Sequence, residues 1–507
     1  MESPKNLEAE HARPAWLSDT AALCYIALAT LLAHILTGGR YGFHRDELAT
    51  LDDARHLAWG YIAYPPITPL FGRVSLRLFG TSLAGFRFFA YLAQAAAVLF
   101  TGLIAREFGA RRGAQIVAAL AAVPHCLAGT LMQYGAFDYF FWVLAAYFVV
   151  RLLKSGNAKW WIGIGSAIGF GMMSKYTMAF FAAGVAAGIL LTDARRFLKS
   201  AWLWLGVALA LLIFLPNLIW EIQHNFVSFA FLRTIHARDI ALGWTNYFLP
   251  LQFGAILLAF PLAIAGLYFC FASSQGRRYR VLGWMYLTPV ILFLITRARP
   301  YYLAPAYPML YAAGAVWGQE WLANLKRVSA SLVKIFVSVA LAVDIVATGA
   351  FTLPIAPVGS AWWNHSANVN GVYRDEIGWP DLVQAIAEVR DSLPADERAH
   401  VAVLAANYGE AGAVNLFGPR YGLPSVISGG NSFWAHGHGD PPPQTVIVVG
   451  FSHEFVENHF ASCQLAAKIW NQYGVTTKET QDYPEIYVCR DLKMSWPELW
   501  KNFQYFG

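Results

Sequence analysis

Stretches of about 20 mostly apolar residues recur along the first 350 residues, and this repetition restricts the fold more than any other feature. A helix needs roughly 20 such residues to cross a bilayer core. Backbone groups in lipid must be hydrogen-bonded within their own segment, so these stretches fold as helices. We expect eleven spans, near residues 18–38, 82–105, 113–131, 137–152, 159–174, 177–192, 200–219, 244–272, 280–297, 302–318 and 330–353.

The composition agrees with a polytopic membrane protein. Hydrophobic residues make up 57% of the 507 residues and charged residues only 13%, whereas soluble domains carry about 25% charged residues. The 19 tryptophans suit helix ends anchored at the headgroups. The net charge of +6 is spread over short clusters between apolar stretches. Nucleic acid is therefore not expected as a partner, whereas membrane lipids are.

Five short basic connections alternate with the spans. They contain Arg106, Arg111 and Arg112; Arg151, Lys154 and Lys159; Arg195, Arg196 and Lys199; Arg277, Arg278 and Arg280; and Lys326 and Arg327. By the positive-inside rule these turns face the cytoplasm. This predicts a cytoplasmic N-terminus and an exoplasmic tail. The polar leader lacks a small-residue cleavage site, so we expect the first span to be retained.

The pattern changes at about residue 355 to alternating helix and strand signals. Residues 379–393 have the spacing of an amphipathic helix, and residues 401–406 and 445–449 form short apolar runs typical of buried strands. The Gly- and Pro-rich segment 429–443 indicates a loop. We therefore predict a transmembrane catalytic domain over residues 1–354 and a small exoplasmic (periplasmic) α/β domain over residues 355–507.

Acidic residues follow the first span and open the fourth. Asp46 and Glu47 form either a general base or cation site at the membrane surface or a solvated loop pair. Asp52 and Asp53 could equally be charges on a helix surface. Asp138 is either a helix N-cap or one of the costly ionisable residues that mark function in membrane proteins.

Basic and aromatic residues gather on the same predicted outer side. Lys175 lies there against the positive-inside trend, and a second cluster contains Arg297, Arg299, Tyr301 and Tyr302. Cations beside the bilayer suit a phosphate, for which arginine offers a two-pronged contact. Arg233 and His236, in the stretch 220–243, either complete such a phosphate site or pack on the membrane interface.

In this order, these residues resemble the polyprenyl-phosphate-dependent glycosyltransferases with the GT-C fold, the group of protein O-mannosyltransferases and lipid A aminoarabinose transferases. The resemblance covers roughly residues 15–320 and rests on the acidic pair Asp46–Glu47, on Asp138, on the Lys175 turn and on the segment 299–305. The tail segments 407–412 and 429–434 look like the exoplasmic domain of bacterial members. Two departures are the Lys-Tyr-Thr order at residues 175–177, where many relatives carry Lys-Gly-Pro, and the two basic residues before Asp46.

The resemblance implies an inverting transfer of a sugar from a polyprenyl-phosphate carrier to a hydroxyl acceptor in the cell envelope, at the outer face of a bacterial inner membrane. Asp46 would activate or hold the acceptor, and Glu47 and Asp138 would shape the site or hold a divalent cation. No other cofactor is expected. Lys175, Arg299 and Arg233 would stabilise the departing phosphate, because preorganised cations favour the charge that develops there.

The sequence also allows other classes of function. A secondary transporter also carries intramembrane charges, but such proteins usually show inverted repeats, which we do not find in the sequence. A receptor, or a protein that only binds a lipid-linked substrate, is a further alternative. The histidines His44, His56, His125 and His224 have ordinary structural explanations, whereas His436 and His438 form either a metal site or part of a flexible loop.

Cys463 and Cys489 are the two cysteines of the tail, and we expect them to form a disulfide. The predicted exoplasmic location is oxidising, and residues 464–488 read as a helix followed by a strand whose ends can return to each other. The alternative is two separately buried thiols. Closing this loop would stabilise the domain by about 3 kcal/mol.

Overall fold

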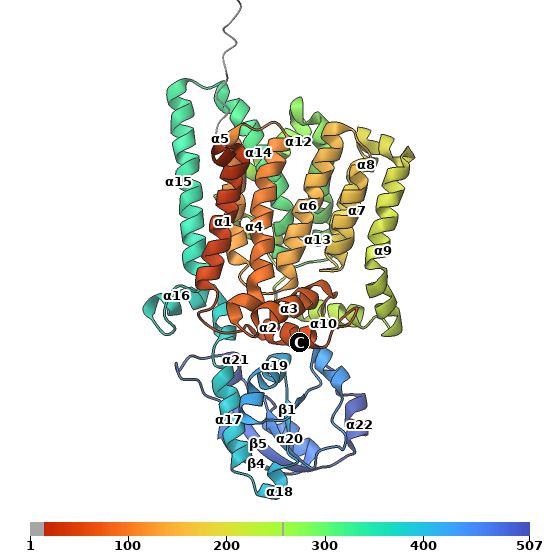
Figure 1. The fold of residues 1–507 in the computed structure, drawn as a ribbon, viewed down its shortest axis with the longest axis vertical. Coiled ribbons are helices and arrows are strands. Elements are labelled where there is room, and N and C mark those ends of the chain that lie inside the picture. The colour runs from red at the N-terminus through yellow and green to blue at the C-terminus, as the bar shows by residue number, and fades with distance from the viewer. Residues whose placement is uncertain (1–14, 256–257) are drawn as a thin grey trace, which may run out of the picture.

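The computed structural model describes residues 15–255 and 258–507, so the polar leader of the sequence lies outside the described residues. Figure 1 shows a bundle of steep helices above a smaller domain that contains a sheet. Three short helices lie across the end of the bundle that faces this domain: α2 (Arg45–Arg55), α3 (Ile67–Phe79) and α10 (Val227–Ala241). We call this end the domain end of the bundle.

Six helices in the described part are long and apolar enough to cross a membrane: α1 (Asp19–Thr37), α4 (Leu83–Glu107), α6 (Tyr134–Ser155), α9 (Ala201–Gln223), the continuous segment of η3 (Gln275–Tyr279) and α13 (Arg280–Ile295), and α15 (Arg327–Thr352). A seventh span results if α8 (Met178–Leu190) and η2 (Asp193–Lys199) are joined despite a bend of 101°. The protein is therefore a multi-pass membrane protein.

The remaining predicted spans also fall on helices, but on shorter ones. These are α5 (Arg112–Ala128), α7 (Trp160–Met172), α12 (Phe260–Ala272) and α14 (Tyr307–Ala323). The stretch expected at 244–272 is divided between α11 (Phe248–Ala255) and α12, and residues 256–257 lie outside the described part. Because these helices are shorter than a bilayer core ordinarily requires, the number of eleven spans stays a prediction.

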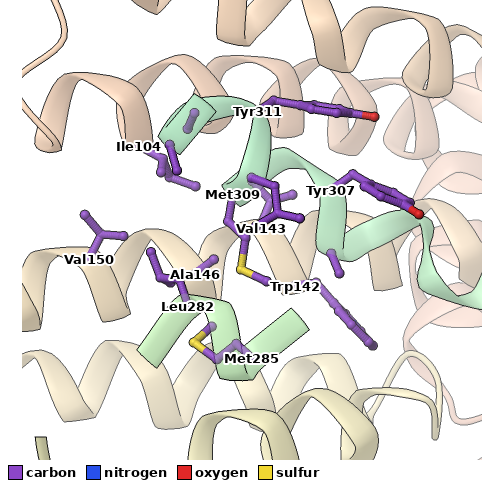
Figure 2. Packing of buried hydrophobic residues seen from close by; sticks show 14 of the residues in the cluster. Ile104, Trp142, Val143, Ala146, Val150, Leu282, Met285, Tyr307, Met309 and Tyr311 are labelled. Atoms are coloured by element: carbon purple, nitrogen blue, oxygen red, sulfur yellow. The ribbon is translucent and has the colours of Figure 1, made fainter. Parts of the chain in front are cut away.

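The core of the bundle is built from large and small apolar side chains of α4, α6, α13 and α14. Figure 2 shows Trp142 and Val143 of α6 packed near Met285 of α13 and Met309 of α14, and all four are buried. Small residues bring other helices closer. A methyl group on Gly165 of α7 would collide with the carbonyl oxygen of Gly206 on α9. Such close backbone contact is the usual way in which helices associate in a bilayer.

Two of the basic connections contact each other, so they lie on the same side of the membrane-spanning bundle. Glu107, at the end of α4, accepts from Arg151 over 2.8 Å and from Lys154 over 3.0 Å, both near the end of α6. The connection from α14 to α15 lies at the top of the view in Figure 1, away from the C-terminal domain. These basic turns therefore lie at the end of the bundle opposite the domain end.

After α15 the chain forms the helices α16 (Ala361–Val369), η5 (Gly371–Glu376), α17 (Trp379–Asp391), α18 (Ala395–Arg398), α19 (Tyr408–Phe417), η6 (Gly418–Tyr421), η7 (Asn431–His436), α20 (His453–His459), α21 (Lys478–Gln481) and α22 (Trp496–Lys501). The helix predicted at 379–393 is present. The segment 429–443, predicted as a loop, contains the short helix η7. The helices η1 (Ala15–Leu17) and η4 (Pro300–Ala306) belong to the bundle.

A five-stranded sheet organises this part of the chain, in the order β2-β1-β3-β5-β4. The strands are β1 (Ala402–Ala405), β2 (Val426–Ile427), β3 (Thr445–Val449), β4 (Phe460–Lys468) and β5 (Glu485–Leu492). The first three are parallel, and β5 pairs antiparallel with both β3 and β4. Both strands predicted from apolar runs are present, since β1 and β3 lie at the buried centre of the sheet.

Cys463 and Cys489 form the expected disulfide, with their Cα atoms 4.1 Å apart. They are direct partners across the antiparallel pair β4 and β5. The prediction of a helix just after Cys463 is wrong, because residues up to Lys468 continue strand β4. The bridge therefore links two neighbouring strands at the edge of the sheet.

Candidate active site

A cavity of about 530 Å³ lies at the domain end of the bundle. Its walls come from α2, the turns before α6 and α8, helix α10, the start of η4 and two segments of the C-terminal domain. The predicted site residues that line it are Asp46, Lys175, Arg233, His236, Arg299 and Tyr302. The fold thus brings together residues that lie up to 256 positions apart in the sequence, from Asp46 to Tyr302.

Asp46 lies in the first turn of α2, whose N-cap is His44. One carboxylate oxygen of Asp46 accepts from the hydroxyl of Tyr408 over 2.8 Å, and the other accepts from Nε2 of Gln133 over 2.7 Å. Its side chain is nevertheless 39% exposed and lines the cavity. Two fixed donors therefore orient a carboxylate that a substrate in the cavity can reach.

Glu47 does not line the cavity, and its contacts suit the predicted role of shaping the site more than a role in catalysis or metal binding. Its side chain is fully buried and its two oxygens accept from Nε and Nη2 of Arg87 over 2.8 and 2.6 Å. The same oxygens also accept from the backbone N–H groups of Met132 and His44. A carboxylate so fully occupied holds α2 against α4 and has no free position for a cation.

Lys175 lies in the turn between α7 and α8 and points among tyrosine rings. Its Nζ lies 4.2 Å from the ring centroid of Tyr302, 5.3 Å from that of Tyr134 and 5.5 Å from that of Tyr301. An ammonium over aromatic faces is stabilised by their quadrupoles. These rings hold the charge of Lys175 at the cavity wall without neutralising it.

Asp138 lies behind Lys175 and does not line the cavity, so its contacts suit the predicted role of shaping the site. Its Oδ1 accepts from Nε1 of Trp142 and its Oδ2 from the hydroxyl of Thr177, each over 2.9 Å. Oδ2 also lies 3.9 Å from Nζ of Lys175. Asp138 and Glu47 have separate sets of hydrogen-bond partners. Asp138 fixes the turn that carries Lys175.

Arg299 lies at the cavity, but its charge is already paired. Its guanidinium contacts both carboxylate oxygens of Asp239 on α10, over 2.5 and 2.7 Å. Arg297, predicted beside it, is exposed and does not line the cavity. Tyr301 lies next to the cavity and accepts from Nη1 of Arg299 over 3.2 Å. Arg299 therefore fastens α10 to the start of η4, whereas Arg297 lies outside the cavity lining.

Helix α10 supplies further basic residues to the cavity lining. Arg233 and His236 both line it, and Arg233 is exposed. The sequence contained no clear signal for this helix, because it mixes apolar and charged residues after a span. Asp239 was missed for the same reason. Its importance follows only from its pairing with Arg299, 60 residues later.

The sequence left open whether Asp53 belongs to the site or is a helix-surface charge, and the structure shows that it is buried and lines the cavity. The hydroxyl of Tyr64 donates to its Oδ2 over 2.6 Å. Burial raises the pKa of Asp53 to about 8, although the hydrogen bond from Tyr64 acts in the opposite direction. Burial thus favours the neutral carboxyl group at this position more than at an ordinary exposed aspartate.

The C-terminal domain forms one wall of the cavity through Tyr408, Asn431, Ser432 and Phe433. These residues belong to the two tail segments that looked like the exoplasmic domain of bacterial members. The remaining wall is largely apolar and includes Phe180, Phe229, Phe231, Leu232 and Phe293. The cavity thus combines a reachable carboxylate, fixed cations and a surface suited to a hydrocarbon chain.

Comparison with known proteins identifies similar sequences. A family model described as dolichyl-phosphate-mannose-protein mannosyltransferase matches residues 63–220. The lipid A galacturonosyltransferase RgtD of Rhizobium johnstonii is 27% identical over 304 residues, which cover 54% of this chain and 61% of that protein. The match thus spans less than two thirds of the relative's length.

Two crystal structures of ArnT from Cupriavidus metallidurans share the fold. The structure bound to undecaprenyl phosphate matches with a TM-score of 0.58 over 93% of this chain and 98% of ArnT. The apo structure matches with a TM-score of 0.56 over 92% and 98%. Sequence identity is 16% in both cases. The chain therefore has the GT-C fold, and the resemblance to glycosyltransferases of this fold that the sequence indicated is confirmed.

Proposed function

We propose that this protein is an inverting glycosyltransferase that moves a sugar from a polyprenyl-phosphate carrier to a hydroxyl acceptor in the cell envelope. The observation that carries the proposal is the cavity in which the carboxylate of Asp46 faces a wall with Lys175 and Arg233. A base and a phosphate-binding cation on one cavity are the two groups that such a transfer requires.

Lys175 is the group that we assign to the phosphate of the carrier. Its ammonium is held by three tyrosine rings and lies at the cavity wall. As the bond to the sugar breaks, negative charge grows on the phosphate, and a preorganised cation stabilises that transition state. Arg233 supplies a second cation. Arg299 has a positioning role, because its guanidinium is paired with Asp239 and holds α10 at the cavity.

Asp46 is the group that we assign to the acceptor. With both oxygens oriented by neutral donors, it can take the proton of a hydroxyl as that hydroxyl attacks the sugar. Attack from the side opposite the phosphate inverts the configuration at the sugar carbon. The apolar wall around Phe229 and Phe293 suits the lipid chain of the donor.

The same geometry supports an orientation in the membrane. Basic turns lie at one end of the bundle and the cavity at the other, so the positive-inside rule places the N-terminus in the cytoplasm and the cavity outside. We accordingly propose a bacterial inner-membrane protein with a catalytic domain over residues 1–354 and an exoplasmic domain over residues 355–507. The name of the Rhizobium relative suggests lipid A as one acceptor to test.

The comparisons favour a transferase over a secondary transporter, because the family model and the named relative both describe sugar transfer. The structure adds a reason of its own. Asp46 and Lys175 face a cavity at one end of the bundle, whereas transporters bind their substrates near the middle of the bilayer.

The decisive test uses the purified full-length protein in lipid nanodiscs with a panel of radiolabelled polyprenyl-phosphate sugars and envelope lipids. We expect transfer by the wild type, and a loss of roughly 100- to 10,000-fold in Asp46→Asn, since the amide keeps the shape but not the basic oxygen. Binding of the carrier lipid should persist. The matched control is Asp396→Asn, an exposed aspartate in the C-terminal domain. Near-normal turnover of Asp46→Asn would remove Asp46 from the catalytic role.

A further inference from the structure

Three potential metal ligands meet beside the cavity, where α2 contacts the C-terminal domain. Asp52 and His56 lie at the end of α2, and His436 is the last residue of η7. Each side chain offers a ligand atom, and these atoms lie within 4.8 Å of one another. None of the three residues lines the cavity. The cluster is also separate from Glu47 and Asp138, which the sequence suggested for a cation.

The surroundings of Asp52 distinguish this cluster from an accidental arrangement of polar side chains. Its side chain is only 3% exposed, and its Oδ1 accepts from Nδ2 of Asn415 over 2.8 Å. Its Oδ2 has no hydrogen-bond partner among the described residues, and lies 3.4 Å from Nδ1 of His56 and 3.8 Å from Nδ1 of His436. A buried carboxylate oxygen without a partner is costly, so a cation between it and the two imidazoles would remove that cost.

His56 contacts Asp52 through one ring nitrogen. Its Nδ1 lies 3.0 Å from the main-chain oxygen of Asp52 and 3.4 Å from Oδ2 of the same residue. A metal ion between Oδ2 and Nδ1 would replace the contact of Nδ1 with the main-chain oxygen, because a nitrogen that binds a metal ion must be unprotonated.

We propose that Asp52, His56 and His436 bind one Zn²⁺ ion. Two imidazoles and one carboxylate suit zinc, whereas calcium and magnesium take oxygen ligands. Ligands of a tetrahedral zinc ion lie roughly 3.3 Å apart. The two imidazoles can rotate to reach that spacing because their side chains are 56% and 31% exposed. Their exposure also leaves the fourth position to water.

The ion would act as a clamp and not in the transfer itself. Helix α2 carries Asp46, and η7 carries Ser432 and Phe433, which form part of the cavity wall. A metal bond between Asp52 and His436 fixes these two walls relative to each other. Tyr408, which donates a hydrogen bond to Asp46, also lies on the side of the C-terminal domain that contacts α2.

The test measures metal in the purified full-length protein and does not depend on transfer activity. We expect about one zinc ion per chain by mass spectrometry after dialysis, and titration of stripped protein with Zn²⁺ alone should show a single tight site. His436→Ala and His56→Ala should each weaken zinc binding at least tenfold. His453→Ala is the matched control, because this exposed histidine contacts only Glu457 and Tyr487 in the described part.

A second readout tests the clamp. Zinc should raise the thermal stability of the wild type and of His453→Ala, and slow proteolysis between the bundle and the domain, but do neither in His436→Ala. Size-exclusion profiles establish that each variant is folded. Zinc binding that is equal in the wild type and His436→Ala, or absent from the wild type, would overturn the proposal. The cluster would then be a set of polar contacts around Asp52 that holds no metal ion.

Discussion

At the scale of single residues, two adjacent carboxylates have different surroundings. Asp46 lies at the cavity with neutral donors around it, whereas Glu47 is fully buried against Arg87. Neighbouring residues on a helix point about 100° apart, so one can face a cavity while the other faces the core. The sequence shows the pair but not which carboxylate faces which way.

The buried pair yields a prediction about stability. Glu47→Gln leaves the guanidinium of Arg87 with only part of its counter-charge inside the protein. Removing one partner of a buried ion pair typically costs about 3 to 5 kcal/mol, so we expect a clearly lower unfolding temperature in detergent. Transfer per folded molecule should fall far less than in Asp46→Asn. If Glu47→Gln is as stable as the wild type but inactive, Glu47 and not Asp46 is the chemical group.

At the scale of elements, the edge of the sheet depends on a covalent bond. Strand β4 is largely exposed along its length and pairs only with β5 among the described strands. The disulfide between Cys463 and Cys489 closes a loop with a sequence separation of 26 residues. This should stabilise the folded domain by about 3 to 4 kcal/mol in the chain-entropy model.

The measurement compares Cys463→Ser with Cys24→Ser, which removes an exposed free cysteine of α1. Only Cys463→Ser should lower the unfolding temperature of the full-length protein. Only it should also abolish the shift in gel mobility between reduced and non-reduced samples. Equal stability of the two variants would mean that the sheet edge relies on its hydrogen bonds and core alone.

The elements also show which parts of the structure could be predicted from the sequence. The long spans and the buried strands β1 and β3 could be predicted, since hydrophobic burial there dominates the local pattern. Helix α10 could not be predicted. It pairs with Arg299 and lines the cavity, and its sequence has no regular apolar face. The site residues Asp46 and Lys175 were visible as charges in unusual places. Asp239 and Tyr408 acquire their roles only through tertiary contacts.

At the scale of the whole molecule, a buried cluster joins the bundle to the C-terminal domain. Nη2 of Arg87 donates to Oε1 of Glu376 over 3.1 Å, and the other oxygen of Glu376 has no partner in the described part. Burial raises the pKa of Glu376 to about 7, and Glu47 acts in the same direction, whereas Arg87 and His44 lower it. The carboxyl groups of Glu47 and Glu376 thus share one guanidinium, that of Arg87, where the bundle meets the C-terminal domain.

This cluster predicts a pH dependence of stability. A carboxyl whose pKa is raised on folding stabilises the protein while it is protonated, and that contribution is lost as pH rises from about 4.5 through about 7. Glu376→Gln cannot lose a proton. Its unfolding temperature, measured relative to the wild type, should therefore increase between pH 5 and pH 9. A constant difference over this range would show that Glu376 does not titrate there.

The last prediction concerns the side of the membrane on which the site lies. The cavity includes residues of both the bundle and the C-terminal domain, so a lipid-linked donor must reach it from the same side as the domain. The basic turns lie at the other end, and the positive-inside rule assigns that end to the cytoplasm. We expect a membrane-impermeant maleimide to label Glu454→Cys, an exposed position of α20, in intact bacterial cells. It should label Ser155→Cys, at the exposed last residue of α6, only after the cells are lysed. Both variants are made in a Cys24→Ser background, which removes the exposed native thiol. The reverse labelling pattern would place Asp46 and Lys175 in the cytoplasm, and the proposed transfer at the outer face would be wrong.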